Sequence, residues 1–298
     1  MLSIQHISKQ FETVKALNDV SFEVPNGQIL GLIGQNGAGK STTFHSILNF
    51  IQYEGQIQWQ GHPLSADDFD QIGYLPEERS LMTKLTIEQQ IIYLARLKGR
   101  SAKEIRPQID DWLTRFAVKG TRKSKIKDLS KGNQQKVQLI CTLIHEPTLL
   151  ILDEPFSGLD PVNADLLKQA ILAAKDRGAA IIFSSHDMEN VSTLCDQLVM
   201  LRKGDVVLHG TLDEVRNQFG KSELYVTTDW SQAQLTDLPH VQTVESRHGH
   251  HYLLHLDDPG AGPAIFDALT QGHYIEEFSQ QPPSLDAIFR MKVGETNV

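Results

Sequence analysis

Cysteine is almost absent from this chain. Its 298 residues include only Cys141 and Cys195, and neither has a second Cys or a His at the close spacing of a zinc site or a redox motif. A secreted fold held together by disulfides is therefore excluded. We expect both thiols to be small buried hydrophobes in a reducing compartment.

Long apolar runs are also missing. No run approaches the roughly 18 residues that a membrane-spanning helix requires, and residues 1–6 lack the basic stretch followed by an apolar one that opens a secretory signal. We therefore expect a cytosolic protein. Such a protein acts at a membrane only by docking onto a partner that supplies the membrane spans.

The chain has no excess of positive charge. It contains 28 Lys and Arg against 37 Asp and Glu, for a net charge of -9, and a chain this acidic repels a phosphate backbone. Nucleic acid is therefore not an expected partner. The hydrophobic share of 40% and the charged share of 22% are ordinary for globular proteins, and the length predicts one large and one small domain.

Residues 1–60 alternate short apolar runs with turn signals, which predicts strands over 2–7, 20–24, 28–33 and 56–59 and one helix over 42–49. The period becomes helical over 86–146. Thr86 and Gln89 form a predicted capping box, a second apolar stripe runs from Ile105 to Phe116 with Pro107 in its first turn, and a third helix follows Ser130.

Strand and helix patterns alternate from 148 to 218, as in a parallel sheet covered by helices. The pattern changes near residue 220. Strand-like stretches at 224–227, 241–244 and 252–256 and helix-like stretches at 264–269 and 284–291 predict a small α+β domain. We therefore expect domains over 1–220 and 221–298, with a helical subdomain at about 86–146.

Residues 34–42 match the pattern G-x-x-x-x-G-K-S/T between a predicted strand and a predicted helix. Glycines there let backbone N–H groups converge on phosphate oxygens, and the helix N-terminus adds partial positive charge. Lys40 would reach the β- and γ-phosphates and Ser41 would offer a hydroxyl to Mg²⁺. A glycine turn that binds nothing is the alternative. The candidate phosphate-binding residues are Gly34, Gln35, Asn36, Gly37, Ala38, Gly39, Lys40, Ser41 and Thr42.

Two carboxylates end the apolar run at 148–152. Asp153 and Glu154 should lie at the carboxyl end of a buried strand, the edge at which open parallel sheets bind ligands. Asp153 suits the Mg²⁺ shell, and Glu154 can face the water that attacks the γ-phosphate. The alternative is an acidic turn with a structural role only.

This combination resembles the ATPase subunits of ATP-binding cassette (ABC) transporters over about the first 220 residues. The segment 129–135, Leu-Ser-Lys-Gly-Asn-Gln-Gln, is similar to the family signature, His186 matches the switch histidine, and Phe11 stands where an aromatic ring usually stacks on adenine. The loop after the second carboxylate resembles the family's D-loop at Ser157, Gly158, Leu159 and Asp160.

The resemblance implies an α/β P-loop NTPase of the ABC-ATPase type, with a helical subdomain, an antiparallel β subdomain and a small C-terminal α+β domain. It also implies that two nucleotide domains join head to tail, in a homodimer or a heterodimer. As the predicted N-cap of a helix, Ser130 forms an anion site that has no phosphate of its own nearby in sequence. The family pattern lets a second chain's ATP contact Ser130, Lys131, Gly132 and Asn133.

The chain departs from the family pattern in two places. Lys131 and Asn133 replace a glycine and the glutamine of the signature, and the added positive charge beside phosphate should be tolerated. Glu77 stands where the family usually has a glutamine that senses Mg²⁺ and the membrane partner. A carboxylate there either joins the Mg²⁺ shell or pairs with a base such as Arg79, and we favour the metal.

Histidines crowd the C-terminal region, at His248, His250, His251 and His255. A metal site is the alternative to a strand with one solvated face, and we favour the strand because no Cys or carboxylate spacing supports zinc. The region resembles the accessory domains of bacterial exporter ATPases.

The predicted function is an ATP-binding and ATP-hydrolysing subunit, with Lys40, Glu154 and His186 as catalytic residues and ATP and Mg²⁺ as cofactors. By resemblance, it dimerises around Mg-ATP and drives a separate membrane permease, an exporter, from the cytoplasmic face. The rival is a soluble ABC-type ATPase acting on ribosomes or nucleic acid, which usually has two cassettes or a coiled coil. A small-molecule P-loop kinase would leave Ser130 and Asp160 unexplained.

Overall fold

The computed structural model describes residues 1–78, 80–271 and 274–294. It divides into two compact units, Met1–His209 and Gly210–Val298. The sequence placed this boundary at 220/221, after helix α8 (Leu212–Asn217), whereas the structure assigns α8 to the second unit. The physical reason is a pair of hydrogen bonds, because the Arg216 guanidinium donates to the carbonyl oxygens of Pro282 and Pro283 at 3.3 and 3.2 Å.

The centre of the first unit is a six-stranded sheet in the order β10-β9-β3-β8-β7-β6. Its strands are β3 (Ile29–Ile33), β6 (Ile72–Leu75), β7 (Leu149–Leu152), β8 (Ala180–Ser185), β9 (Gln197–Arg202) and β10 (Asp205–Thr211). The five strands from β9 to β6 pair in parallel. Their carboxyl ends therefore meet at one edge, and the continuous apolar runs of β3 and β7 follow from burial on both faces.

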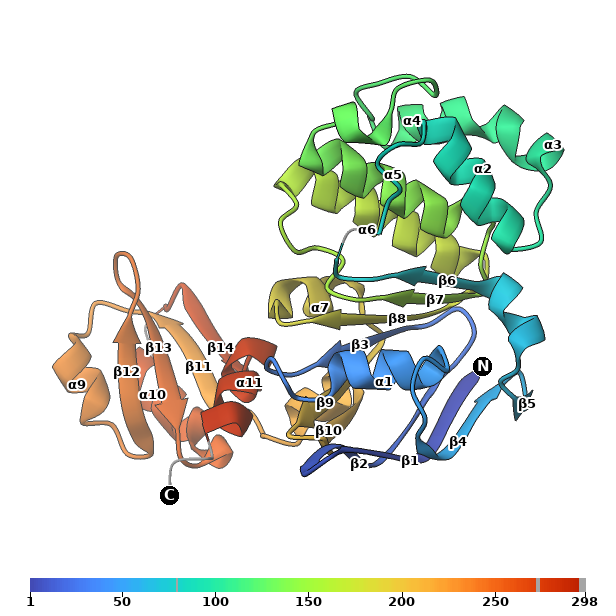
Figure 1. Ribbon diagram of the computed structural model, residues 1–298. Coiled ribbons are helices and arrows are strands. Elements are labelled where there is room, and N and C mark those ends of the chain that lie inside the picture. The colour runs from blue at the N-terminus through green and yellow to red at the C-terminus, as the bar shows by residue number, and fades with distance from the viewer. Residues whose placement is uncertain (79, 272–273, 295–298) are drawn as a thin grey trace. The chain divides into compact units, whose positions relative to one another are not determined.

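A second, antiparallel sheet has the order β2-β1-β4-β5 and consists of β1 (Leu2–Phe11), β2 (Val14–Val24), β4 (Glu54–Trp59) and β5 (His62–Pro63). Helix α1 (Lys40–Ile47) lies between the two sheets (Figure 1). Phe44 and Ile47 of α1 share one core with Leu30 of the parallel sheet and Phe22 and Trp59 of the antiparallel sheet. Helix α1, which follows the glycine-rich loop, is thus packed on both sides.

The helical part of this unit lies beside the β6 edge of the sheet (Figure 1). It comprises α2 (Ile87–Leu97), α3 (Ala102–Ile105), η2 (Arg106–Gln108), α4 (Ile109–Arg115), η3 (Ile126–Asp128) and α5 (Lys131–Leu143). The predicted capping box is confirmed, since the Thr86 hydroxyl accepts from the Gln89 amide at 3.2 Å. The helix predicted from Ile105 to Phe116 is present in segments: Pro107, which has no amide hydrogen to donate, lies in the first turn of η2 as predicted, and right-handed helical backbone leads from α3 through η2 into α4.

The remaining elements of the first unit are η1 (Ala66–Gln71), α6 (Pro161–Asp176) and α7 (Met188–Leu194). Both cysteines are free and buried, and burial raises the pKa of the Cys141 thiol to about 12. Within the described residues, no helix has the length and apolar character needed to cross a bilayer.

The second unit is built on an antiparallel sheet in the order β12-β13-β11-β14. Its elements are α8, β11 (Glu223–Thr227), α9 (Gln232–Thr236), β12 (Val241–Ser246), β13 (His251–Leu256), η4 (Pro259–Ala261), α10 (Gly262–Thr270), β14 (Glu277–Gln281) and α11 (Leu285–Gly294). Leu224, Leu254 and Ile265 form its small core. This is the predicted α+β arrangement, although the sequence analysis missed α9 and β14.

Candidate functional site

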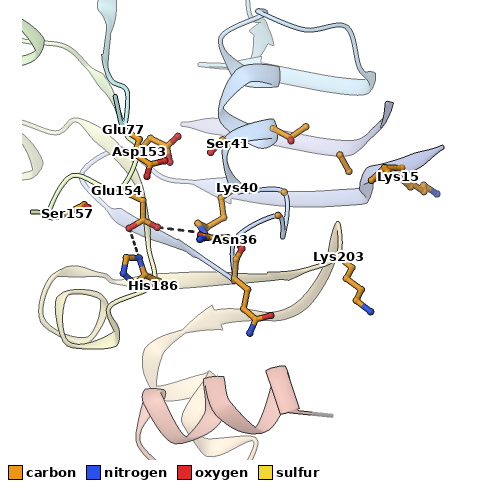
Figure 2. Close-up of a pocket in the computed structure, with 16 residues that line it drawn as sticks. Lys15, Asn36, Lys40, Ser41, Glu77, Asp153, Glu154, Ser157, His186 and Lys203 are labelled. Atoms are coloured by element: carbon orange, nitrogen blue, oxygen red, sulfur yellow. Dashed lines mark hydrogen bonds and ion pairs between the residues drawn. The ribbon is translucent and has the colours of Figure 1, made fainter. Parts of the chain in front are cut away.

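Four loops meet at the carboxyl edge of the parallel sheet. They follow β3, β6, β7 and β8, and the parallel pairing aligns the strand ends, with Leu75 opposite Leu152 and Ile33 opposite Ser185. Residues of all four loops line a cavity of about 610 Å³ (Figure 2). The candidate residues after β3 that line it are Gln35, Asn36, Gly37, Gly39, Lys40, Ser41 and Thr42.

The loop after β3 requires glycine at two positions. A Cβ on Gly34 would lie 2.6 Å from the Leu201 carbonyl oxygen, and one on Gly39 would lie 2.7 Å from that of Ala16. Gly39, with φ of 113°, directly precedes the first turn of α1, so the helix begins at Lys40 rather than at residue 42 as the sequence predicted. The amide groups of this first turn therefore open toward the cavity, the arrangement that suits an anion.

The Lys40 ammonium is nearly buried, with 7% of its side chain exposed. It donates to the Gly34 carbonyl oxygen at 2.7 Å and lies 3.7 Å from Glu154 Oε1. A buried cation needs such compensation because desolvation is costly. The lysine is thus held at the cavity wall by groups that an incoming phosphate can replace.

One hydroxyl organises the two carboxylates after β7. Ser184 donates to Asp153 Oδ1 at 2.6 Å and accepts from the Glu154 amide at 2.7 Å. Asp153 is 4% exposed. Burial of the Tyr74 side chain, together with the negative charge of Asp153, raises the pKa of Tyr74 to about 12. Glu154 has φ of 45°, a left-handed backbone conformation that glutamate rarely adopts. Strand β8 thereby holds the Asp153 carboxylate and the backbone of Glu154.

His186 contacts Glu154 directly. Its Nδ1 lies 2.9 Å from Glu154 Oε2, while Glu154 Oε1 faces Lys40 (Figure 2). The His186 side chain is 66% exposed and that of Glu154 only 11%. The sequence predicted both residues for the site but gave no sign that they would pair. In this arrangement the carboxylate bridges an ammonium and an imidazole.

Glu77 lies beside Asp153 (Figure 2). It is exposed and lines both the first cavity and a second one of about 540 Å³. With Ser41 it brings a third oxygen-bearing side chain to the wall that holds Asp153, and such hard oxygen donors fit Mg²⁺. Arg79, the alternative partner of Glu77, lies outside the described residues.

The sequence analysis missed the opposite wall. Val14, Lys15 and Ala16 at the start of β2 line the cavity, as does Lys203 in the turn between β9 and β10. That turn is tied to the phosphate-binding loop by a hydrogen bond of 3.0 Å from the Gly204 amide to the Ala38 carbonyl. Because no motif marks Lys15 or Lys203, only the packing reveals them.

Phe11 is not among the residues that line the cavity. Its ring is 45% exposed and lies under the Lys9 ammonium, 4.9 Å from the ring centroid. Val14, which opens β2 three residues later, takes that place in the wall and is 65% exposed. Val14 and Ala16 therefore give this wall its apolar surface.

Four signature residues, Ser130, Lys131, Gly132 and Asn133, line neither cavity, whereas Gln135 of the same segment lines the second. Ser130 is the N-cap of α5 and accepts from the Asn133 amide at 3.3 Å; Lys131 is exposed and Gly132 partly so. None of the four signature residues lines either cavity. The structure therefore does not bring them to the phosphate-binding loop of the same chain.

The loop at 157–160 connects the cavity with α6. Ser157 lines both cavities, Gly158 lines the second, and the Leu159 side chain is half-buried. Asp160 is the N-cap of α6 and accepts from the Asn163 amide at 3.0 Å. Its capping role is thus visible within one chain.

The histidines of the second unit do not form one cluster. His250, His251 and His255 each face a different carboxylate, Asp229, Glu277 and Glu245, at 3.8, 3.6 and 3.1 Å. Across residues 1–78, 80–271 and 274–294, no three His, Cys, Asp or Glu side chains gather as a metal site would require.

Each of the two units matches a known protein family. Residues 17–157 match the family described as ABC transporter, and residues 210–293 match the family described as ATP-binding protein DrrA1-3-like, C-terminal domain. The chain is 43% identical over 296 residues to an uncharacterised ABC transporter ATP-binding protein, YhaQ of Bacillus subtilis (strain 168), which covers 99% of each chain.

A second relative is an uncharacterised ABC transporter ATP-binding protein of Alkalihalophilus pseudofirmus, 44% identical over 264 residues, covering 88% of this chain and 98% of the relative. A solved structure of the ATP-binding subunit of an ABC transporter superposes with a TM-score of 0.69 at 35% identity, covering 74% of this chain and 93% of that one. These likenesses confirm the predicted fold class. The chain belongs to the ABC transporter ATP-binding proteins, the family of cassettes that bind ATP and hydrolyse it to drive transport.

Proposed function

We propose that this cavity binds Mg-ATP, that Glu154 directs its hydrolysis, and that two chains close head to tail around the nucleotides to drive a separate membrane permease that exports its cargo. The observation that carries the proposal is the convergence of Lys40, Asp153, Glu154 and His186 on one cavity of about 610 Å³.

Different parts of the cavity wall would contact different parts of the nucleotide. The loop amides and the Lys40 ammonium meet the phosphates, and Lys15 and Lys203 add positive charge on the opposite wall. Val14 offers apolar contact to the base. Ser41, Asp153 and Glu77 would hold Mg²⁺, which supplies positive charge that stabilises the phosphate oxygens during transfer.

Glu154 is the general base in this proposal. Its carboxylate takes the proton of the attacking water, and His186 and Lys40 keep the carboxylate in position through its two oxygens. The Ser184 hydroxyl holds the Glu154 backbone, so the base is fixed before the reaction. Phosphoryl transfer depends mainly on such positioning.

The proposed dimer is supported by an anion site that a single chain does not fill. Ser130 caps α5 at an exposed helix N-terminus, an arrangement that suits an anion, yet it lies outside the lining of the chain's own cavities. A second chain's ATP would place a phosphate there. Family membership supports a separate permease, and the resemblance of the second unit to exporter accessory domains supports export.

Glu154→Gln tests the catalytic role. Removing the base should lower the rate of Mg-ATP hydrolysis roughly 10² to 10⁴-fold while nucleotide affinity is kept, and ATP should then hold the chains as dimers. Lys40→Ala is the matched comparison, because it should weaken nucleotide binding itself. Steady-state turnover and light scattering measure both effects, and turnover unaffected by Glu154→Gln would disprove the role.

The identity of the permease and the direction of transport need separate measurements. A membrane protein encoded by a neighbouring gene should co-purify with the chain and raise its turnover. A strain lacking the chain should retain inside its cells a compound that the parent strain releases. Loss of uptake in that strain would instead establish an importer.

A further inference from the structure

We propose that Asn133 is a positioning residue that aims the Ser130 hydroxyl hydrogen outward, toward a phosphate oxygen of the ATP held by a second copy of this chain. The inference rests on the head-to-tail dimer proposed above. It assigns a role to a residue outside the phosphate-binding loop. Asn133 stands where the family signature has a glutamine.

Ser130 receives two hydrogen bonds from the same residue. Its Oγ accepts from the Asn133 backbone amide at 3.3 Å and from the Asn133 side-chain Nδ2 at 3.0 Å. A serine hydroxyl has two acceptor positions and one donor hydrogen. Because N–H groups take both acceptor positions, the Ser130 hydrogen is directed to a third acceptor, and a phosphate offers acceptor oxygens only.

A third hydrogen bond decides which way the Asn133 amide faces. Its Oδ1 accepts from the Lys119 backbone amide at 2.9 Å. Rotating the side-chain amide by half a turn would bring two N–H groups together at Lys119, so the oxygen belongs there and the NH₂ group faces Ser130. The loop that carries Lys119 is itself held, since Lys136 Nζ donates to the Ala117 carbonyl oxygen at 3.1 Å.

The side-chain contact exceeds what the helix cap needs. An N-cap serine stabilises its helix by accepting from a backbone amide two or three residues on, which the Asn133 amide already supplies. The additional donor, Nδ2, fills the remaining acceptor position of the hydroxyl. It therefore controls the direction of the hydrogen rather than the stability of α5.

The test is a double-mutant cycle on ATP-dependent dimerisation of full-length Glu154→Gln protein, measured by analytical ultracentrifugation. Asn133→Ala should weaken the dimer about tenfold when Ser130 is present, the order of one oriented hydrogen bond to a charged group. In the Ser130→Ala background, where there is no hydrogen to aim, the same change should alter the dimer affinity less than about twofold.

Asn133→Asp separates the orientation of the Ser130 hydroxyl hydrogen from the stability of the helix cap. It keeps an acceptor for the Lys119 amide and places a favourable negative charge in the first turn of α5, so thermal unfolding should show no loss of stability. Its second oxygen accepts from Ser130 and turns the hydroxyl hydrogen inward. The dimer should therefore weaken at least as much as with Asn133→Ala, and part of that loss should disappear in the Ser130→Ala background.

Gln89→Ala is the control, because Gln89 also bonds the N-cap residue of its helix but leaves the cap hydroxyl without a side-chain donor: its side-chain oxygen accepts from the Thr86 backbone amide at 2.9 Å. It should leave dimerisation unchanged. Equal effects of Asn133→Ala with and without the Ser130 hydroxyl would overturn the inference alone. No ATP-dependent dimer in the Glu154→Gln parent would overturn the proposed function and this inference together.

Discussion

The cavity at the sheet edge and the signature turn at the start of α5 are the two anion sites of the proposed function, and they are built in opposite ways. In the cavity, Lys40 and Asp153 are almost buried, and each is compensated by groups of the same chain. At the turn, Ser130 is exposed and accepts hydrogen bonds only from Asn133 among the bonds described above. The cavity is thus preorganised within one chain, whereas the turn is half of a site in the proposed dimer.

This difference follows from where the chain places each region. Four parallel strand ends support the cavity, so its charged groups are desolvated and must be paired. The turn depends only on a helix N-terminus, which needs no buried partner. Substitutions in the two regions should therefore separate nucleotide binding from association.

Ser130→Arg in the Glu154→Gln background should have the largest effect. The longer cation fills the turn and removes the hydroxyl, so ATP-dependent dimers should be lost, by at least 100-fold in dimer affinity by analogy with a hot-spot loss. Nucleotide affinity of the single chain should stay within about twofold. Light scattering with and without ATP measures the first effect and equilibrium nucleotide titration the second. Undiminished dimers would contradict the division between the two regions.

Glu77→Ala should have the next largest effect. Loss of an oxygen ligand or of an outer contact to Mg²⁺ should lower Mg-dependent turnover roughly 10 to 100-fold, while Glu77→Gln, which keeps an oxygen, should retain most of it. ATPase rates across a Mg²⁺ titration report both. The exposed neighbour Glu78 gives the control Glu78→Ala, and indistinguishable curves for all four proteins would remove Glu77 from the metal site.

His145 tests the rule that buried polar groups need compensation. It is 3% exposed, and burial together with the Lys98 charge lowers its pKa to about 4. The unfolded chain takes up a proton near its ordinary value of 6.5 while the folded chain does not, so stability should fall by about 3 kcal/mol as the pH drops from 7 to 4.

Substituting His145→Gln should flatten that dependence between pH 6.5 and 4, as measured by urea unfolding at several pH values. The exposed His209 provides the control His209→Gln. The same slope in the His145 variant as in the parent would show that other groups cause the loss of stability.

The smallest effect should come from removing most of the second unit. All residues that line the first cavity fall between Val14 and Lys203, and the second unit has a core of its own. A chain ending at Lys221 should therefore remain folded and bind ATP within about twofold of the parent, although its coupling to the permease is expected to fail. Soluble truncated chain without nucleotide affinity would show that the second unit completes the cavity.

The sequence predicted the cavity wall that follows the parallel strands. Asp153 and His186 come directly after buried strands, and Lys40 follows the loop after a third such strand. Parallel strands bring such positions to one edge. The opposite wall was not predictable in this way. Lys15 and Lys203 reach the cavity through the packing of antiparallel strands and a turn, for which local sequence carries no mark.

Elements stabilised by distant pairing were missed for the same reason. Strand β14 has a single apolar residue, Phe278, and exists because it pairs with β11. Helix α9 has five residues and depends on Ser231 and Gln234 at its start. The pairing of Glu154 with His186 likewise joins residues 32 positions apart, which no local period indicates.

The left-handed backbone at Glu154 has a consequence for how selection acts on this position. A glutamate in that conformation costs roughly 1 kcal/mol or more relative to glycine, and the contacts of its carboxylate with Lys40 and His186 offset that cost. Under the role proposed for Glu154, selection for hydrolysis keeps the glutamate despite the strain. Under the proposed role of Glu154 as the base, a lineage whose cassette no longer hydrolysed ATP would be free to acquire glycine or asparagine at this position, and a retained glutamate would indicate continued selection for hydrolysis.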